Sequence, residues 1–195
     1  MTSPVPPDVV ATDPIYQFAA QALACLQATY PVSGFMPARF EFRVGTNVTY
    51  DIDQYDDLCC PGLGYVMLGE TYPSSSSFPE QDVVRQANTT CAPPAWAQRI
   101  TVGIIRCIPT VMDDQGTMPS ANDWLLAFHK NVADTMALRR TACCLRSWLS
   151  DQTGLLLGMS MVIENQTQMS PQGGCVERTL TMALQHMNCD CYGQP

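Results

Sequence analysis

The chain alternates between segments with helical and with strand-like spacing of apolar residues, and the first helical segment begins near residue 14. Asp13 suits the cap of a helix, and Pro14 suits its first turn, because the N–H that a proline lacks would be unpaired there anyway. Apolar residues then recur every three or four positions as far as Ala28, which predicts a helix over residues 14–28. Residues 1–12 contain three prolines and predict an extended arm.

A second helix is predicted over residues 121–150, which would reach about 45 Å at 1.5 Å per residue. Ser120 and Asp123 resemble a capping box at its start. The apolar residues of this segment are Trp124, Leu125, Phe128, Val132, Met136, Cys143 and Trp148. The opposite side carries Lys130, Asn131, Asp134, Arg139 and Arg140. A single apolar stripe predicts that the apolar side of this helix lies on a sheet.

Six further segments have the spacing or composition of strands. They are residues 39–44, 48–52, 63–71, 98–110, 154–164 and 174–187. The segment 98–110 has the strongest pattern, and Gly103 inside it indicates a bulge or a close backbone approach. Residues 165–173 predict the polar connection of a C-terminal hairpin. Residues 72–80, with four serines and two prolines, predict a flexible loop, and residues 81–88 predict a turn or two of helix.

Short connections between most strands predict an antiparallel-rich sheet with the N-terminal helix and the long helix packed on one face. The predicted fold class is therefore α+β, with a C-terminal β-hairpin. A length of 195 residues fits one domain, which we place at residues 13–191. The extended arm of residues 1–12 precedes this domain, and a short tail of residues 192–195 follows it.

The composition excludes two classes of protein. With 46% hydrophobic and 14% charged residues, the chain can bury enough apolar surface to offset the entropy of ordering, so it is not disordered throughout. Its longest apolar stretch, residues 155–163, falls far short of the roughly 20 residues of a membrane-spanning helix. Residues 1–14 carry no Lys or Arg and no apolar core, so we expect no signal peptide and synthesis in the cytoplasm.

The net charge of −8 argues against a nucleic-acid-binding protein, because such proteins carry a basic patch. The charge is unevenly distributed: residues 1–97 hold ten acids and three bases, a net of −7, and residues 98–195 hold eight and seven, a net of −1. An acidic protein surface would repel a polyanion and let it pass without binding it. The alternative is that the acidity simply keeps the protein soluble.

Ten cysteines are many for a reducing cytoplasm. They are Cys25, Cys59, Cys60, Cys91, Cys107, Cys143, Cys144, Cys175, Cys189 and Cys191. The two adjacent doublets do not suit zinc, because neighbouring side chains diverge and rarely bind one tetrahedral ion. Disulfides that form after assembly, when the protein meets an oxidising exterior, fit better. The alternative is that the cysteines are small, buried apolar side chains.

Many cysteine pairings are open, and spacing alone does not choose among them. One plausible pairing joins the doublet of residues 59–60 to the doublet of residues 143–144. Another joins Cys175 to Cys189 or Cys191 across the C-terminal hairpin. Pairing of Cys25 or Cys91 with Cys107 has weaker support.

Known catalytic signatures are missing from the sequence. His129 and His186 lie near no Ser or Cys nucleophile motif, and no phosphate-binding glycine loop or zinc-protease motif occurs. Four aspartates crowd one segment, but they do not fit the calcium-loop pattern and predict a solvated acidic loop. These aspartates are Asp51, Asp53, Asp56 and Asp57. We therefore expect no enzymatic activity, no metal and no cofactor.

Five segments together resemble a group of small proteins from the structural gene cassette of long-tailed phages that infect actinobacteria. They are residues 57–66 (DLCCPGLGYV), 72–79 (YPSSSSFP), 96–107 (WAQRITVGIIRC), 137–145 (ALRRTACCL) and 173–175 (GGC). The group is similar to head–tail connector components, the tail terminator in particular. Its known fold is a helix-plus-sheet subunit that forms a hexameric ring.

The resemblance implies a structural protein of the virion, assembled in the host cytoplasm and located at the head–tail junction. A terminator ring caps the tail tube and joins it to the neck, so its partners are further copies of itself, the tail tube protein, and a neck, stopper or adaptor protein. DNA passes through the ring without specific binding, and no membrane is involved. The four clustered aspartates are candidates for an acidic channel lining. Apolar edge residues and the arm of residues 1–12 are candidates for contacts with neighbours.

Three alternatives stay open. Another neck ring, an adaptor or a stopper, is the nearest, and a helical adaptor should lack the strands at residues 98–110 and 174–187. A secreted, cysteine-stabilised binding module would carry an export signal upstream and glycan on Asn47 or Asn88. An enzyme with an unrecognised site would need a pocket that the sequence does not reveal.

Overall fold

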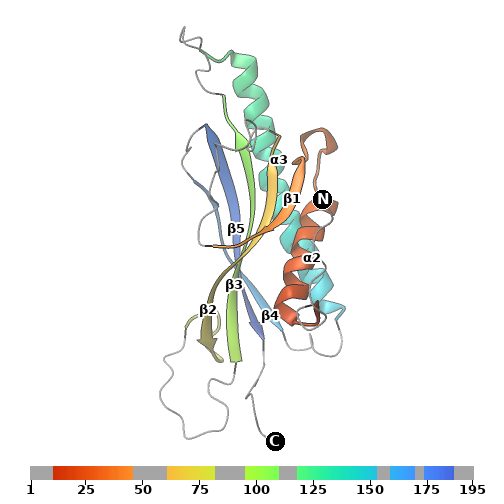
Figure 1. Ribbon diagram of the computed structural model, residues 1–195, viewed down its shortest axis with the longest axis vertical. Helices are drawn as coiled ribbons and strands as arrows, with labels where there is room; N and C mark the ends of the chain where they lie inside the picture. The colour runs from red at the N-terminus through yellow and green to blue at the C-terminus, as the bar shows by residue number, and fades with distance from the viewer. Residues whose placement is uncertain are drawn as a thin grey trace, which may run out of the picture.

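Five strands form one sheet in the order β1-β2-β3-β5-β4 (Figure 1). The computed structural model describes residues 11–45, 61–81, 95–109, 118–152, 159–169 and 174–186. The strands are β1 (Arg39–Arg43), β2 (Leu63–Ser74), β3 (Ala95–Cys107), β4 (Ser160–Gln168) and β5 (Cys175–His186). The helices are α2 (Pro14–Ala28), the short 3-10 helix η1 (Ser33–Phe35) and α3 (Ala121–Ser150).

The sheet is mixed but mostly antiparallel. β1 pairs with β2 in parallel, whereas β2–β3, β3–β5 and β4–β5 are antiparallel pairs. β4 and β5 are consecutive in the chain and form the C-terminal hairpin. The predicted α+β fold with an N-terminal helix, one long helix and an antiparallel-rich sheet is therefore confirmed.

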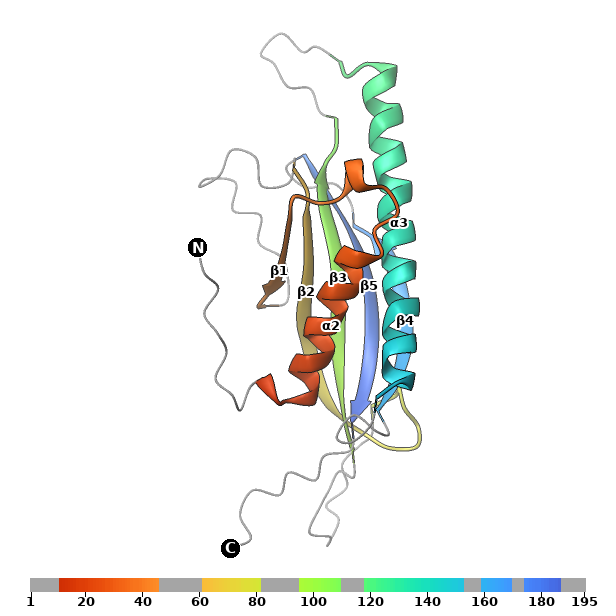
Figure 2. The ribbon, with the colours of Figure 1, turned by 90° about the vertical axis from the view of Figure 1, so that its right-hand side faces the viewer.

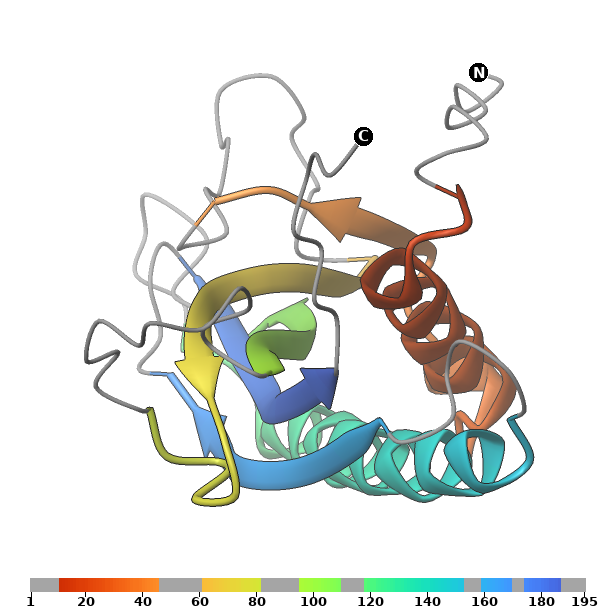
Figure 3. The same ribbon diagram turned by 90° about the horizontal axis from the view of Figure 1, so that it is seen from below.

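Both long helices lie on the same face of a curved sheet (Figures 2 and 3). Asp13 caps α2 as predicted, because its carboxylate accepts hydrogen bonds from the backbone N–H groups of Ile15 and Tyr16 at 2.8 and 3.2 Å. The main core lies between these helices and the central strands. Its largest fully buried members are Phe18, Leu26, Val66, Ile100, Ile104, Leu138, Leu145, Met182 and Leu184. Among the helices that the structure describes, none has the length and apolar character needed to cross a bilayer.

The opposite face of the sheet carries a second, smaller cluster around Tyr65. The ring of Tyr65 lies over Gly103, where an added Cβ would stand 2.2 Å from the ring carbon Cζ. The register is regular at Gly103, so the predicted bulge is wrong and a close approach is the reason for the glycine. The group that approaches it is an aromatic side chain of the neighbouring strand rather than another backbone.

Two predicted connections are strand instead. β2 continues through residues 72–74, which were expected in a loop, because Tyr72 is buried and its hydroxyl donates to the Pro79 carbonyl at 2.8 Å. β4 likewise runs to Gln168, and the Thr167 and Thr179 hydroxyls hydrogen-bond across the hairpin at 2.8 Å. Polar side chains suit these strand ends because they find partners on the neighbouring strand.

Several predictions fall outside the described residues. These are the strand at residues 48–52, the helical turns after residue 81, the start of the strand at residues 154–158, the arm of residues 1–10 and the tail of residues 192–195.

Candidate interaction surface

The long helix α3 extends beyond the sheet at its N-terminal end (Figures 1 and 2). The predicted capping box is present: the Ser120 hydroxyl accepts from the Asp123 N–H at 3.3 Å, and the Asp123 carboxylate accepts from the Ser120 N–H at 2.9 Å. The first buried residue of the helix is Ala133. About twelve residues, or ~18 Å of helix, therefore precede the part that packs on the sheet.

The exposed side of α3 carries a row of large apolar side chains, which we call the outer stripe. It consists of Leu125, Phe128, Val132 and Met136, which are 53%, 64%, 42% and 41% exposed. Their spacing of three, four and four residues places them on one face of a helix with 3.6 residues per turn. An exposed apolar row of this kind is typical of a surface that another protein covers.

The predicted orientation of α3 is wrong. The apolar row was expected to lie on the sheet, but the residues that do so are mostly small. They are Ala133, Asp134, Ala137, Leu138, Thr141, Ala142 and Leu145. Small side chains let the helix approach the sheet closely, whereas the outer stripe is too bulky for that position. Only Trp148 of the predicted row packs on the core, edge-to-face with Phe18 at 6.2 Å.

Asp134, expected on the solvent side, is only 3% exposed because Arg106 of β3 neutralises it. The Arg106 guanidinium donates to both carboxylate oxygens of Asp134, from Nε at 2.7 Å and from Nη2 at 2.9 Å. It also donates to the Tyr30 hydroxyl at 2.7 Å and to the carbonyl of Phe35. A buried charge pair with this many hydrogen bonds is stable only in one geometry, so it fixes the middle of α3 on the sheet.

Burial raises the pKa of Tyr30, and the charge and hydrogen bond of Asp134 raise it further. Burial alone would lower the pKa of Arg106, but the hydrogen bonds and charge of Asp134 outweigh it, so the pKa is raised. Tyr30 therefore stays neutral and Arg106 stays charged at physiological pH.

A cavity of about 260 Å³ lies under the N-terminal half of α3. It is lined by Trp124, Phe128 and Asn131 from the helix and by Ile104, Val176 and Arg178 from the strands, among others. Arg178 donates to the Thr135 hydroxyl at 2.8 Å, and burial lowers the pKa of Arg178. The N-terminal half of α3 is thus loosely packed where it lies over the strands, and Phe128 of the outer stripe borders this cavity.

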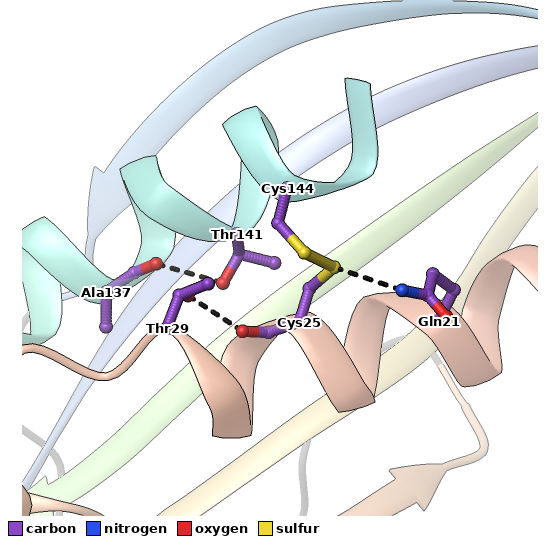
Figure 4. The surroundings of a disulfide bond; sticks show 6 residues. All are labelled: Gln21, Cys25, Thr29, Ala137, Thr141 and Cys144. Atoms are coloured by element: carbon purple, nitrogen blue, oxygen red, sulfur yellow. Dashed lines mark hydrogen bonds between the residues drawn. A yellow bond between two sulfur atoms is a disulfide. The ribbon is translucent and has the colours of Figure 1, made fainter. Parts of the chain in front are cut away.

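A disulfide between Cys25 and Cys144 joins α2 to α3 (Figure 4). The two residues are 119 positions apart in the sequence, and their Cα atoms are 5.9 Å apart. Next to the bond, the Thr29 hydroxyl donates to the Cys25 carbonyl at 2.7 Å. With the Arg106–Asp134 pair, this bond holds α3 at a second point, so the direction of the outer stripe is fixed.

The predicted pairing of the two cysteine doublets is wrong. Cys144 pairs with Cys25, and Cys143 is a free, exposed thiol. Successive helix residues point about 100° apart, so only one member of the doublet faces α2. The weaker pairing of Cys25 with Cys107 is wrong as well, because Cys25 is bonded to Cys144. Cys107 and Cys175 each take part in a disulfide too. The other predicted cysteines, Cys59, Cys60, Cys91, Cys189 and Cys191, lie outside the described residues.

A second apolar surface is a groove of about 520 Å³ between α2 and the edge strand β1, which we call the β1 groove. It is lined by Asp13, Ile15, Tyr16, Ala19, Phe42, Arg43, Val44, Val66 and Leu68. Phe42, Val44 and Leu68 are 46%, 99% and 45% exposed. Figure 3 shows α2 between β1 and α3, so the β1 groove and the outer stripe lie on opposite sides of α2.

The remaining candidate residues form no further site within the part of the chain that the structure describes. The clustered aspartates Asp51, Asp53, Asp56 and Asp57 lie outside the described residues, so the acidic lining stays a prediction. His129 is exposed on α3. In the described ranges, no three His, Cys, Asp or Glu side chains come together in a way that could hold a metal ion.

The sequence pattern contains both apolar surfaces, since their residues belong to the predicted helices and strands. It does not say which apolar residues the fold leaves uncovered. No protein-family model and no curated protein matches this chain. The two exposed apolar surfaces are therefore the features from which a function is argued.

Proposed function

We propose that this protein is a ring-forming structural subunit at the head–tail junction of a long-tailed phage. In this role it caps the tail tube, joins it to the neck and leaves a channel for DNA. The observation that carries the proposal is the presence of two different exposed apolar surfaces on one subunit, the outer stripe on α3 and the β1 groove beside α2. A subunit with two unlike surfaces can join its neighbours head to tail and close into a ring.

The charge of the chain supports the same role. A net charge of −8 would repel DNA, so a ring made of such subunits would let DNA pass without holding it. The resemblance to tail terminators implies a hexamer. The four clustered aspartates are the candidates for the lining of its channel.

A predominantly helical adaptor is the less favoured neck component, because β3 and β5, with 13 and 12 residues, are the central strands of this fold. A stopper ring at the same junction fits the two apolar surfaces equally well. The second candidate function is a secreted binding module, which the Cys25–Cys144 disulfide favours because disulfides persist in oxidising surroundings. Glycan on Asn47 or Asn88 would identify this second function.

Electron microscopy of lysates from phage that lack this gene tests the proposal. We expect DNA-filled heads without tails, together with free tails of abnormal length, and we expect the wild-type gene supplied in trans to restore whole virions. Tails of normal length already joined to filled heads in the deletion lysate would contradict a role at this junction.

A further inference from the structure

The cavity beneath the N-terminal half of α3 carries more positive than negative charge. Its lining includes three bases, Arg106, Lys130 and Arg178, and one acid, Asp134, a net of +2 in a chain whose net charge is −8. Asp134 is already held by Arg106 through hydrogen bonds of 2.7 and 2.9 Å. Lys130 and Arg178 form no ion pair within the described part of the chain, so their charges are free to attract a ligand.

Arg178 of β5 is held in place by neutral groups. Its Nη1 donates to the Thr135 hydroxyl at 2.8 Å, and its Nη2 donates to the side-chain carbonyl of Gln168. Its buried Nε has no hydrogen-bond partner in the described ranges. Burial lowers the pKa of Arg178, and the charge of Asp134 offsets only part of this effect. A guanidinium that is fixed, partly desolvated and short of one acceptor favours an anionic ligand.

The rest of the cavity lining is largely apolar. Ile104 and Val176, which are 1% and 8% exposed, belong to the strand side. Trp124 and Phe128 belong to the helix side and are 50% and 64% exposed, so they connect the cavity with the surface. The volume of about 260 Å³ exceeds the roughly 150 Å³ that encloses a benzene molecule, so one ring with a charged substituent would fit.

We propose that this cavity binds a small organic anion, with its carboxylate or phosphate group held by Lys130 and Arg178 and its apolar part against Trp124 and Phe128. Lys130 lies on α3 and Arg178 on β5, so a bound anion would link the N-terminal half of the helix to the sheet. A ligand that binds only the folded protein stabilises it, so the unfolding temperature would rise. This inference does not rest on the proposed role at the head–tail junction, because it concerns a site within one subunit.

Titration of the full-length protein with four probes tests the site. Benzoate and phenyl phosphate combine a ring with the two kinds of anionic group. Benzyl alcohol has the ring without the charge, and inorganic phosphate has the charge without the ring. Binding is followed by NMR at the indole N–H of Trp124, and the indole N–H of Trp148, which packs on the core, is the internal reference. Thermal unfolding in the presence of each probe is the second readout.

We expect saturable binding of benzoate or phenyl phosphate with a Kd of about 1 mM or lower, and the tighter of the two identifies the anionic group. The same probe should raise the unfolding temperature. Benzyl alcohol and inorganic phosphate should each bind at least about tenfold more weakly, because each lacks one part of the contacts.

Two variants and a matched control locate the binding. Lys130→Gln and Arg178→Gln each remove one charge from the cavity, and each should weaken binding of the preferred probe by about tenfold or more. The control Arg139→Gln removes an exposed base of α3 outside the cavity lining and should bind like the wild type. Circular dichroism checks that each variant is folded. If Arg178→Gln disturbs the fold through its lost hydrogen bonds, Lys130→Gln carries the test alone.

Three results would overturn the inference. The first is that neither ring-bearing anion binds saturably up to about ten times the expected Kd. The second is that benzyl alcohol or inorganic phosphate binds as tightly as the preferred probe, which would remove the charge or the ring from the requirement. The third is that Arg139→Gln weakens binding as much as Lys130→Gln, which would indicate attraction by the general charge of the helix. In all three cases the deletion phage still decides the role at the junction.

Discussion

Arg106 donates hydrogen bonds to Tyr30 and Phe35, which follow α2, and to Asp134 of α3. Arg106 is 6% exposed and Asp134 is 3% exposed, so neither charge can be hydrated if its partner is lost. Removing one partner of a buried ion pair costs more free energy than the intact pair contributes to stability. These residues therefore act on the position of α3 more than on the net stability of the fold.

Substitution Arg106→Met should lower the free energy of unfolding by about 3–5 kcal/mol, because it leaves Asp134 buried without a partner. The double variant Arg106→Met/Asp134→Leu should recover most of this loss. Urea unfolding followed by circular dichroism measures both. The control on the same strand is Arg99→Met. The Arg99 side chain is 37% exposed beside Glu70 and Glu164, so its loss should cost at most about 1 kcal/mol. Equal losses for Arg106→Met and Arg99→Met would contradict the special role of the buried pair.

Gly103 gives a second prediction at this scale. An added methyl group would stand 2.2 Å from Cζ of the Tyr65 ring, which is fully buried and cannot move aside freely. Gly103→Ala should therefore cost about 1–3 kcal/mol of unfolding free energy, as overpacking does elsewhere. Gly34→Ala is the matched control, because nothing lies within 4 Å of its added Cβ. A Gly103 variant as stable as the Gly34 variant would show that the ring moves without cost.

The elements themselves followed largely from local signals. Asp13-Pro14 and the Ser120–Asp123 capping box placed the starts of α2 and α3, because the groups that cap a helix are close in sequence. The orientation of α3 could not be predicted from such local signals. Large apolar residues dominate the periodic pattern, whereas the face that packs on the sheet is built from alanines and a neutralised aspartate. The partner that makes Asp134 acceptable, Arg106, is 28 residues away in the sequence.

The link between the helices also depends on distant residues. Cys25 and Cys144 close a loop of 119 residues, and closing long loops removes the most entropy from the unfolded chain. Replacing both cysteines by alanine should lower the unfolding free energy by about 2–4 kcal/mol. Thermal unfolding with and without reductant measures the effect. Cys143→Ser, at the free and exposed neighbour, should leave the stability unchanged. A double variant with wild-type stability would mean that packing alone holds α2 against α3.

At the scale of the whole molecule, the fold class could be predicted from the sequence and the candidate surface could not. Pairing of β1 with β2 in parallel, which makes β1 an edge and opens the groove beside α2, depends on contacts between distant segments. The outer stripe is visible in the sequence as an apolar row, yet its exposure follows only from the way Arg106 and Cys25 orient α3. The charges of the chain, by contrast, can be counted from the sequence alone. Which of them lie beside the outer stripe is known only once the orientation of α3 is known.

The charges around the outer stripe give the last prediction. If the bases of α3 lie at a contact between subunits of the proposed ring and meet acidic side chains of the neighbouring copy, salt should weaken the assembly. The Debye length falls from roughly 30 Å at 0.01 M to about 3 Å at 1 M ionic strength. The double variant Arg139→Gln/Arg140→Gln should assemble more slowly at low salt and should lose most of this salt dependence, because charges at the rim of an interface act mainly on the association rate.

Stopped-flow light scattering at several salt concentrations measures the association rate. Arg39→Gln is the control: it removes an exposed base from β1, outside the residues that line the groove. This variant should not lose the salt dependence, because Arg39 lies on β1 and removing a base there cannot weaken an attraction that the bases of α3 supply. An unchanged salt dependence in the Arg139/Arg140 variant would place the attraction elsewhere. Since the apolar stripe is intact in that variant, assembly at high salt should match the wild type, which separates the electrostatic contribution from the burial of Leu125 and Phe128.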